Sequence, residues 1–428
     1  MLERATPGHK PPRPDVFVHV MRSSEHRIRH FQERETMAGI ENWLLTEDPS
    51  AEYPPSPEPR ETWPLPGGVA WVYQAPRHRV LTRPVVLADG FSLGRSNRDE
   101  LYHRMQNLAF PFISELHNRD YDLVIVGYDE RSAAIQDNAE AATAAISQAV
   151  TQRQGSADLI VGGFSMGGLV TRYALAKMEH DDLLHGEVGT YVSFDSPHRG
   201  AWIPISLQAL AHIAESIAPK LREQVNSPAA RQLLALHTET FVADPAQDPL
   251  RRQFLDDLRR YGGWPRQPIK LGIANGAGNG VGNGIPPGAL TLSSETANLG
   301  LRLYAQDNTD DFVVAALRFL TQSFEKKTSG LARADSAPGG TLASFGIAAE
   351  YLKEIDPDVQ CPYPDVNFVP SVSAVAVRDI LTDTDLYTDI SELSTDESEL
   401  DRFMLSSTNT EHSAMTKEIA NWFFEQIP

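Results

Sequence analysis

Residues 158–170, with the sequence DLIVGGFSMGGLV, join a strand pattern, a tight turn and the start of a helix. The apolar run from Leu159 to Val161 is typical of a buried strand. Apolar positions then recur at three and four residues from Leu169 to Ala176, which predicts a helix. Between them stands glycine-x-serine-x-glycine, centred on Ser165. In a sharp strand-to-helix turn this pattern lifts a serine hydroxyl clear of the sheet and points the first helical amides toward it. We therefore expect Ser165 to be a nucleophile.

Strand and helix patterns alternate on both sides of this turn. Buried strands are predicted at 84–88, 121–128, 189–194 and 269–274, with a helix at 135–150. An early antiparallel edge strand is predicted at 69–73, and the final core strand or its approach at 368–377. This alternation predicts an α/β fold with a mostly parallel, doubly wound sheet.

Segments outside the alternation predict additions to this core. Residues 1–65 are rich in proline and charge and are predicted to form an N-terminal extension and linker, with amphipathic helices within 19–45. The first part of the core is assigned to 66–201. A mostly helical cap is predicted at 202–264, where an insertion would cover the carboxyl ends of the strands. The rest of the core is assigned to 265–428, with a further insertion at about 285–365 that includes strands at 290–292 and 299–304.

Composition limits the partners and the compartment. The 428 residues are 41% hydrophobic, which is ample for a large core, and carry a net charge of −19. That charge argues against nucleic acid or an anionic membrane surface as a partner. No apolar run is long enough for a membrane span, and the N-terminus does not resemble a secretory signal. The single cysteine, Cys361, excludes an internal disulfide and fits a reducing compartment, so a cytoplasmic location is expected.

Three further motifs accompany the serine turn: ADGF at 88–91, DSPHRGA at 195–201 and NTEHS at 409–413. Together they resemble an α/β-hydrolase of the lipase/esterase kind, as an ordered set of elements over residues 66–428. The resemblance implies an α/β-hydrolase fold, Ser165 as nucleophile, His412 as base and an acyl-enzyme intermediate. It also implies that no metal or organic cofactor takes part.

A serine nucleophile needs a base, and His412 is the best placed of the 13 histidines. It lies in a short polar loop just before the terminal helix, which fits the chain order serine, acid, histidine of this class of fold. His198 is its one rival, because it follows a strand end, but a structural role in the turn explains it more simply.

The acid that orients the histidine is less sharply defined. Its usual position is the turn after the strand at 269–274, but residues 275–284 there supply only asparagine, glycine, alanine and valine. Asp195 at the preceding strand end is the leading candidate, and Asp365 and Asp379 are the alternatives. The 275–284 run resembles a phosphate-binding loop only superficially, since no lysine follows, and a flexible loop is expected.

Two backbone amides are predicted to stabilise the oxyanion of the reaction. In this class of fold one comes from the residue after the nucleophile, here Met166, and the other from the loop after an early strand, here Phe91. The acids Asp383 and Asp385 could suggest calcium, but a solvated loop explains them, so no metal site is predicted.

The leading hypothesis is a serine carboxylic-ester hydrolase, such as a lipase, esterase or phospholipase, that acts on a hydrophobic ester. The apolar residues of the cap favour a lipid or another hydrophobic small molecule as substrate. An acyltransferase or a cyclising thioesterase would use the same acyl-enzyme, and the alternatives differ in how well water is excluded. A binding module that has lost activity is the third possibility, because a fold does not by itself imply chemistry.

Overall fold

The computed structural model describes residues 53–107, 109–214, 219–296, 299–319, 322–353 and 356–428. Its central sheet has eight strands in the order β1-β2-β4-β3-β5-β6-β7-β14. The strands are β1 (Glu61–Leu65), β2 (Gly68–Tyr73), β3 (Pro84–Ala88), β4 (Asp122–Tyr128), β5 (Leu159–Phe164), β6 (Val188–Phe194), β7 (Ile269–Ala274) and β14 (Arg402–Leu405). The pairs from β4 to β14 are all parallel, whereas β1 and β2 pair antiparallel. The predicted mostly parallel α/β fold is confirmed.

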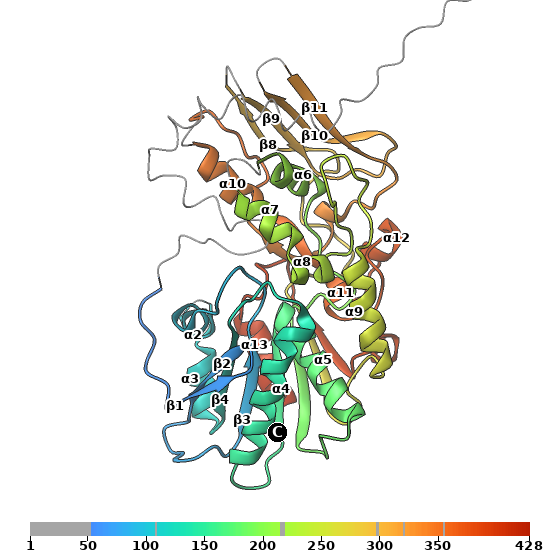
Figure 1. Cartoon of the computed structure of the whole chain (residues 1–428). Coiled ribbons are helices and arrows are strands. Elements are labelled where there is room, and N and C mark those ends of the chain that lie inside the picture. Colours follow the sequence, from blue (N-terminus) through green and yellow to red (C-terminus); the bar gives the residue numbers. More distant parts are fainter. Residues whose placement is uncertain (1–52, 108, 215–218, 297–298, 320–321, 354–355) are drawn as a thin grey trace, which may run out of the picture.

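Helices cover both faces of this sheet. Successive side chains of each strand point to opposite faces, so both faces carry apolar residues that pack against helices. In β3, for example, Val86 packs in one hydrophobic cluster and Val85 in the other. The first cluster includes α4 (Ile135–Gln152) and α5 (Met166–His180), and the second includes α3 (Phe112–Asn118) and α13 (Lys417–Gln426). Figure 1 shows α4 and α5 in front of the sheet and α13 behind it. The short helix α2 (Arg98–Gln106) lies next to α3.

The chain leaves β3 for β4 on one side and then returns to β5 on the other side of β3. Such a reversal of strand order opens a crevice at the carboxyl ends of the two strands, and ligands bind there in open α/β sheets. The ADGF motif follows β3 and the serine turn follows β5. The fold therefore places both motifs at one switch point.

A second layer lies beyond the carboxyl ends of the central strands (Figure 1). Its four-stranded antiparallel sheet has the order β11-β10-β9-β8, and α6 contacts β9 and β10 while α10 contacts β8. The elements after β6, apart from the core strands β7 and β14 and helix α13, are α6 (Ile205–Ile213), α7 (Pro219–Asn226), α8 (Pro228–Leu233), α9 (Pro249–Arg260), β8 (Leu290–Glu295), β9 (Leu299–Tyr304), β10 (Phe312–Phe319), β11 (Gln322–Thr328), η3 (Ala334–Ser336), β12 (Gly339–Leu342), α10 (Ser344–Lys353), β13 (Val366–Pro370), α11 (Ser371–Ala374), α12 (Asp383–Leu386) and η4 (Thr395–Glu397).

Three expectations from the sequence were wrong in detail. The strand at 69–73 is not at the edge, because β1 pairs outside it, and β1 lies within the segment assigned to the extension 1–65. The apolar run at 368–377 does not join the central sheet, because β13 pairs with β12 in a separate two-stranded sheet. The last core strand is instead β14, a four-residue edge strand whose shortness hides it in the sequence. The helices expected within 19–45, and the extension up to residue 52, fall outside the described residues.

Candidate active site

Ser165 occupies a strained turn between β5 and α5. Its φ of 53° and ψ of −122° are rare for a residue with a side chain, and such strain is held only where the surrounding structure enforces it. The Ser165 amide donates to the carbonyl of Phe194 at 2.8 Å. Two residues on, a Cβ at Gly167 would lie 2.2 Å from the Ala88 carbonyl oxygen, so only glycine allows the helix to approach β3 this closely. The serine turn predicted from the sequence is present.

The register of the sheet places Asp195 beside Ser165. Phe164 of β5 pairs with Phe194 of β6, so the two residues that follow leave neighbouring strands at the same edge. Asp195 is fully buried. Its Oδ1 accepts the Asn275 amide at 3.0 Å, and its Oδ2 lies 2.6 Å from Nδ1 of His412.

His412 reaches this carboxylate from the loop between β14 and α13. Its amide donates to the carbonyl of Thr341 at 2.8 Å, and its ring packs edge-on against Phe368 with centroids 4.8 Å apart. Beneath the pair, a Cβ at Gly340 would lie 1.9 Å from Asp195 Oδ2. Glycine therefore lets β12 support the carboxylate directly. The strands β12 and β13, which are absent from the central sheet, form part of the wall of the site.

The second ring nitrogen of His412 has a different neighbour. Its Nε2 lies 3.3 Å from Ser413 Oγ, and the structure shows no hydrogen bond from Ser165 Oγ to the His412 ring. Because Nδ1 faces a carboxylate, it carries the ring proton and leaves Nε2 as an acceptor. Hydrogen bonds between catalytic groups are often long before substrate binds, so this arrangement is compatible with Nε2 as the base.

The two predicted oxyanion amides border the serine turn. Met166 is the first residue of α5, where a helical N–H has no partner within the helix. Within the described part of the chain, neither the Met166 amide nor the Phe91 amide donates a hydrogen bond. The residue before Phe91 touches the nucleophile, because a Cβ at Gly90 would lie 3.3 Å from Ser165 Cβ. Both amides therefore lack a hydrogen-bond acceptor within the described residues, and the turn that carries Phe91 approaches Ser165 through Gly90.

The alternative residues from the sequence lie elsewhere. Asp365 and Asp379 are exposed, and Asp379 accepts the Ile380 amide. His198 is buried in the turn after β6, where its Nε2 contacts Ser193 Oγ at 3.0 Å. Burial lowers the pKa of His198 well below its usual range, and Arg172 adds to this effect. His198 is therefore a neutral structural residue of the turn.

The acids considered for calcium are engaged in local contacts. Asp383 pairs with Arg333 at 2.8 Å, and Asp385 accepts from the hydroxyl of Thr382, the residue that caps α12. No group of three or more His, Cys, Asp or Glu side chains that could hold a metal ion occurs among the described residues. The same residues contain no helix that is long and apolar enough to cross a membrane.

Sequence reasoning missed several residues of this site. Asn275 opens the run expected to be a flexible loop, yet it is only 1% exposed, and its side chain donates to Thr410 Oγ1 at 3.0 Å. The expectation of a flexible loop was wrong at this end, because its residues pack between β12 and the histidine loop. Gly340 and Ser413 carried no recognisable signal. For Ser413, only its position after the candidate base could have drawn attention to it.

One known family matches part of this chain. The PGAP1-like alpha/beta domain family matches residues 97–243, about a third of the sequence, which include the serine turn. No curated protein matches the sequence.

Solved structures match at low similarity. A Bacillus licheniformis lipase in its mature form is 13% identical, with 49% of this chain and 72% of that chain covered and a TM-score of 0.30. An esterase from the archaeon Pyrobaculum calidifontis is 15% identical, with 62% and 80% covered and a TM-score of 0.31. A thermostable carboxylesterase cloned from a metagenomic library is 15% identical, with 59% and 85% covered and a TM-score of 0.30. Similarities this low carry no information about substrate.

Proposed function

We propose that this chain, which has the α/β-hydrolase fold, is a serine hydrolase of carboxylic esters with Ser165, His412 and Asp195 as its triad. The family match and the fold support a hydrolase. The observation that carries the finer proposal is the 2.6 Å contact between His412 Nδ1 and buried Asp195, at the strand end next to the strained serine. A buried carboxylate that orients a histidine beside a serine is the arrangement that activates the hydroxyl.

The first half of the reaction forms an acyl-enzyme. Ser165 Oγ attacks the ester carbonyl carbon while His412 Nε2 takes the hydroxyl proton. Asp195 stabilises the imidazolium through Nδ1, and the Phe91 and Met166 amides donate to the oxyanion. The tetrahedral intermediate then expels the alcohol, which receives the proton from Nε2. Before the attack, Nε2 must exchange its contact with Ser413 for one with Ser165.

The second half repeats these steps with water. His412 takes a proton from water, the resulting hydroxide attacks the acyl carbon, and Ser165 leaves with the proton returned from Nε2. The residues named here supply the nucleophile, the base and the oxyanion donors. A hydrophobic acyl group is the proposed substrate class, because the segment after β6 is rich in apolar residues and much of it lies beyond the carboxyl ends of the central strands (Figure 1).

A fluorophosphonate probe tests the proposal most directly. We expect one adduct per chain, which peptide mapping places on Ser165, and we expect hydrolysis of p-nitrophenyl esters that increases with acyl length up to a limit. Ser165→Ala, shown to be folded by circular dichroism, should give neither adduct nor turnover. Labelling without hydrolysis, together with product formation when an acceptor alcohol is added, would replace the hydrolase with an acyltransferase. A folded wild-type protein without label or turnover, with and without detergent, would favour a binding module.

A further inference from the structure

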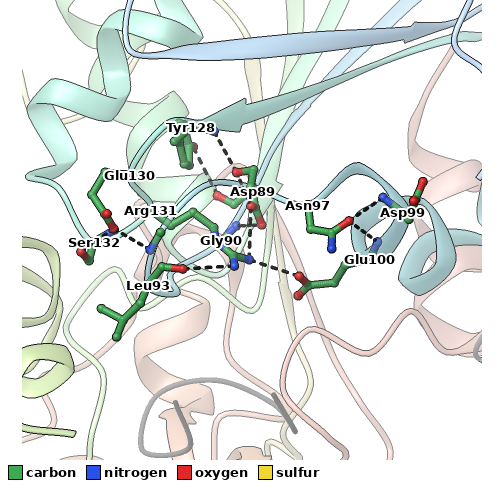
Figure 2. A network of polar contacts seen from close by, with 12 residues as sticks. Asp89, Gly90, Leu93, Asn97, Asp99, Glu100, Tyr128, Glu130, Arg131 and Ser132 are labelled. Atoms are coloured by element: carbon green, nitrogen blue, oxygen red, sulfur yellow. Dashed lines mark hydrogen bonds and ion pairs between the residues drawn. The ribbon is translucent and has the colours of Figure 1, made fainter. Parts of the chain in front are cut away.

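A buried polar network surrounds Asp89, directly after β3 and outside the triad (Figure 2). The Asp89 side chain accepts the Gly90 amide at Oδ1 and the Ser96 hydroxyl at Oδ2, each at 2.6 Å. Arg131 Nη1 lies 3.8 Å from the same Oδ2. Burial raises the pKa of Asp89, and Arg131 acts against this rise. Each carboxylate oxygen therefore has a donor.

The same network connects the loop from 89 to 96 to the last residue of β4 and to the loop that follows it. The Ser96 amide donates to the Tyr128 carbonyl at 2.9 Å, and Ser96 Oγ accepts the Tyr128 amide at 2.8 Å. The Tyr128 hydroxyl donates to the Asp89 carbonyl at 3.2 Å. In the middle of the loop, the Arg131 amide donates to the Gly94 carbonyl at 2.9 Å. Asp89 and Ser96 thus close the loop at both of its ends.

This loop carries one of the proposed oxyanion amides. Because the Asp89 side chain engages the Gly90 amide, the next N–H in the chain, that of Phe91, is the one left to donate. The loop also lies against the nucleophile, since a Cβ at Gly90 would lie 3.3 Å from Ser165 Cβ and 3.9 Å from its Oγ. The next peptide carries the Phe91 N–H, so a rotation of the Asp89–Gly90 peptide would also change the direction in which that N–H points.

We propose that Asp89 is a positioning residue for the oxyanion loop: it holds the Gly90 amide so that the Phe91 amide points at the developing oxyanion. The inference rests on the proposed hydrolase function and adds to it a residue that does not touch the substrate. It requires that loss of Asp89 weakens stabilisation of the tetrahedral state more than it weakens binding of the ester ground state.

The test compares Asp89→Ala and Asp89→Asn with a matched buried aspartate. Asp122 begins β4, at the opposite end of the sheet, is fully buried and accepts the Ala75 amide at 2.9 Å and the Thr82 amide at 2.7 Å. Asp122→Ala removes a comparable carboxylate away from the loop. For each variant we would measure kcat and KM for a p-nitrophenyl ester, Ki for a trifluoromethyl ketone, and the unfolding midpoint. The ketone adds to the serine as a tetrahedral oxyanion, so its Ki reports directly on the amides.

For Asp89→Ala we expect a loss of kcat of roughly 10- to 100-fold, below the full loss of one oxyanion donor, with KM within about threefold and Ki raised in proportion to the kcat loss. Asp89→Asn keeps an acceptor for the Gly90 amide and should recover part of both. Asp122→Ala should lower the unfolding midpoint but leave both kcat and Ki at their wild-type values. If Asp89→Ala does not fold, Ser96→Ala takes its place with the same expected pattern.

Two results would overturn the positioning role: a kcat loss without a parallel rise in Ki, or an Asp89→Ala variant that loses only stability, as Asp122→Ala does. Failure of the proposed function would look different. In that case the wild-type protein itself would show no hydrolysis and no fluorophosphonate adduct, and the proposal for Asp89 would fall with it.

Discussion

The substitution Asp195→Asn is expected to stop catalysis through the wrong imidazole tautomer. The backbone decides how the new amide lies, because the Asn275 N–H points at Oδ1 from 3.0 Å. The side-chain oxygen of the variant keeps that position, and its NH₂ then faces His412 Nδ1. The reversed amide would put two donors together in a fully buried site, at a cost of about 1–3 kcal/mol.

With an NH₂ donor at 2.6 Å, Nδ1 of His412 must accept, and the ring proton moves to Nε2. A protonated Nε2 of the neutral ring cannot take the proton of Ser165. The same substitution in the serine-protease triad lowers kcat about 10⁴-fold, and we expect a loss of this order, equal to about 5 kcal/mol in the activation barrier. Stability should change little, because the bond to Asn275 is kept.

The assay is kcat for a p-nitrophenyl ester near pH 8, together with the rate of fluorophosphonate labelling, which should fall in parallel. Asp122→Asn serves as the control for loss of a buried carboxylate, and its kcat should stay within about threefold of the wild type because the sites are far apart. A kcat for Asp195→Asn within about tenfold of the wild-type value would refute the tautomer argument and the role of Asp195.

Three further substitutions test other parts of the site. Gly340→Ala places a methyl group 1.9 Å from the original position of Asp195 Oδ2, so kcat should fall roughly 100-fold while urea denaturation still shows a folded protein; an unchanged kcat would contradict this close packing. Ser413→Ala frees Nε2 of His412 from a competing donor and should speed fluorophosphonate labelling up to about fivefold, whereas slower labelling would mean that Ser413 assists the base. Burial raises the pKa of Asp335 to about 6, so the folded state binds this proton more tightly than the unfolded chain. This carboxyl alone should therefore contribute about 1–2 kcal/mol more to the free energy of unfolding at pH 5 than at pH 7.5, which is read as the difference between the wild type and Asp335→Asn. Asp335→Asn should lack this increment, and denaturation curves of both proteins at both pH values would show whether it does.

The sequence by itself determined the strands of the sheet from β2 to β7 and the serine turn. These features are local: a buried strand and an amphipathic helix show their periodicity within a few residues, and the strain at Ser165 needs small residues directly beside it. The approximate place of the base was also readable, since His412 lies in a polar loop just before a recognisable helix.

Only the tertiary structure brought Asp195 to His412, because 217 positions separate them and neither lies in a periodic pattern. The same holds for the edge strand β14, which is too short to show a period, and for β13, whose apolar residues are buried in a second small sheet rather than in the central one. The Asp89 network was hidden for a related reason. Its donors come from two loops, and loops meet through sheet register, which is fixed by the packing of the whole core rather than by the residues of either loop.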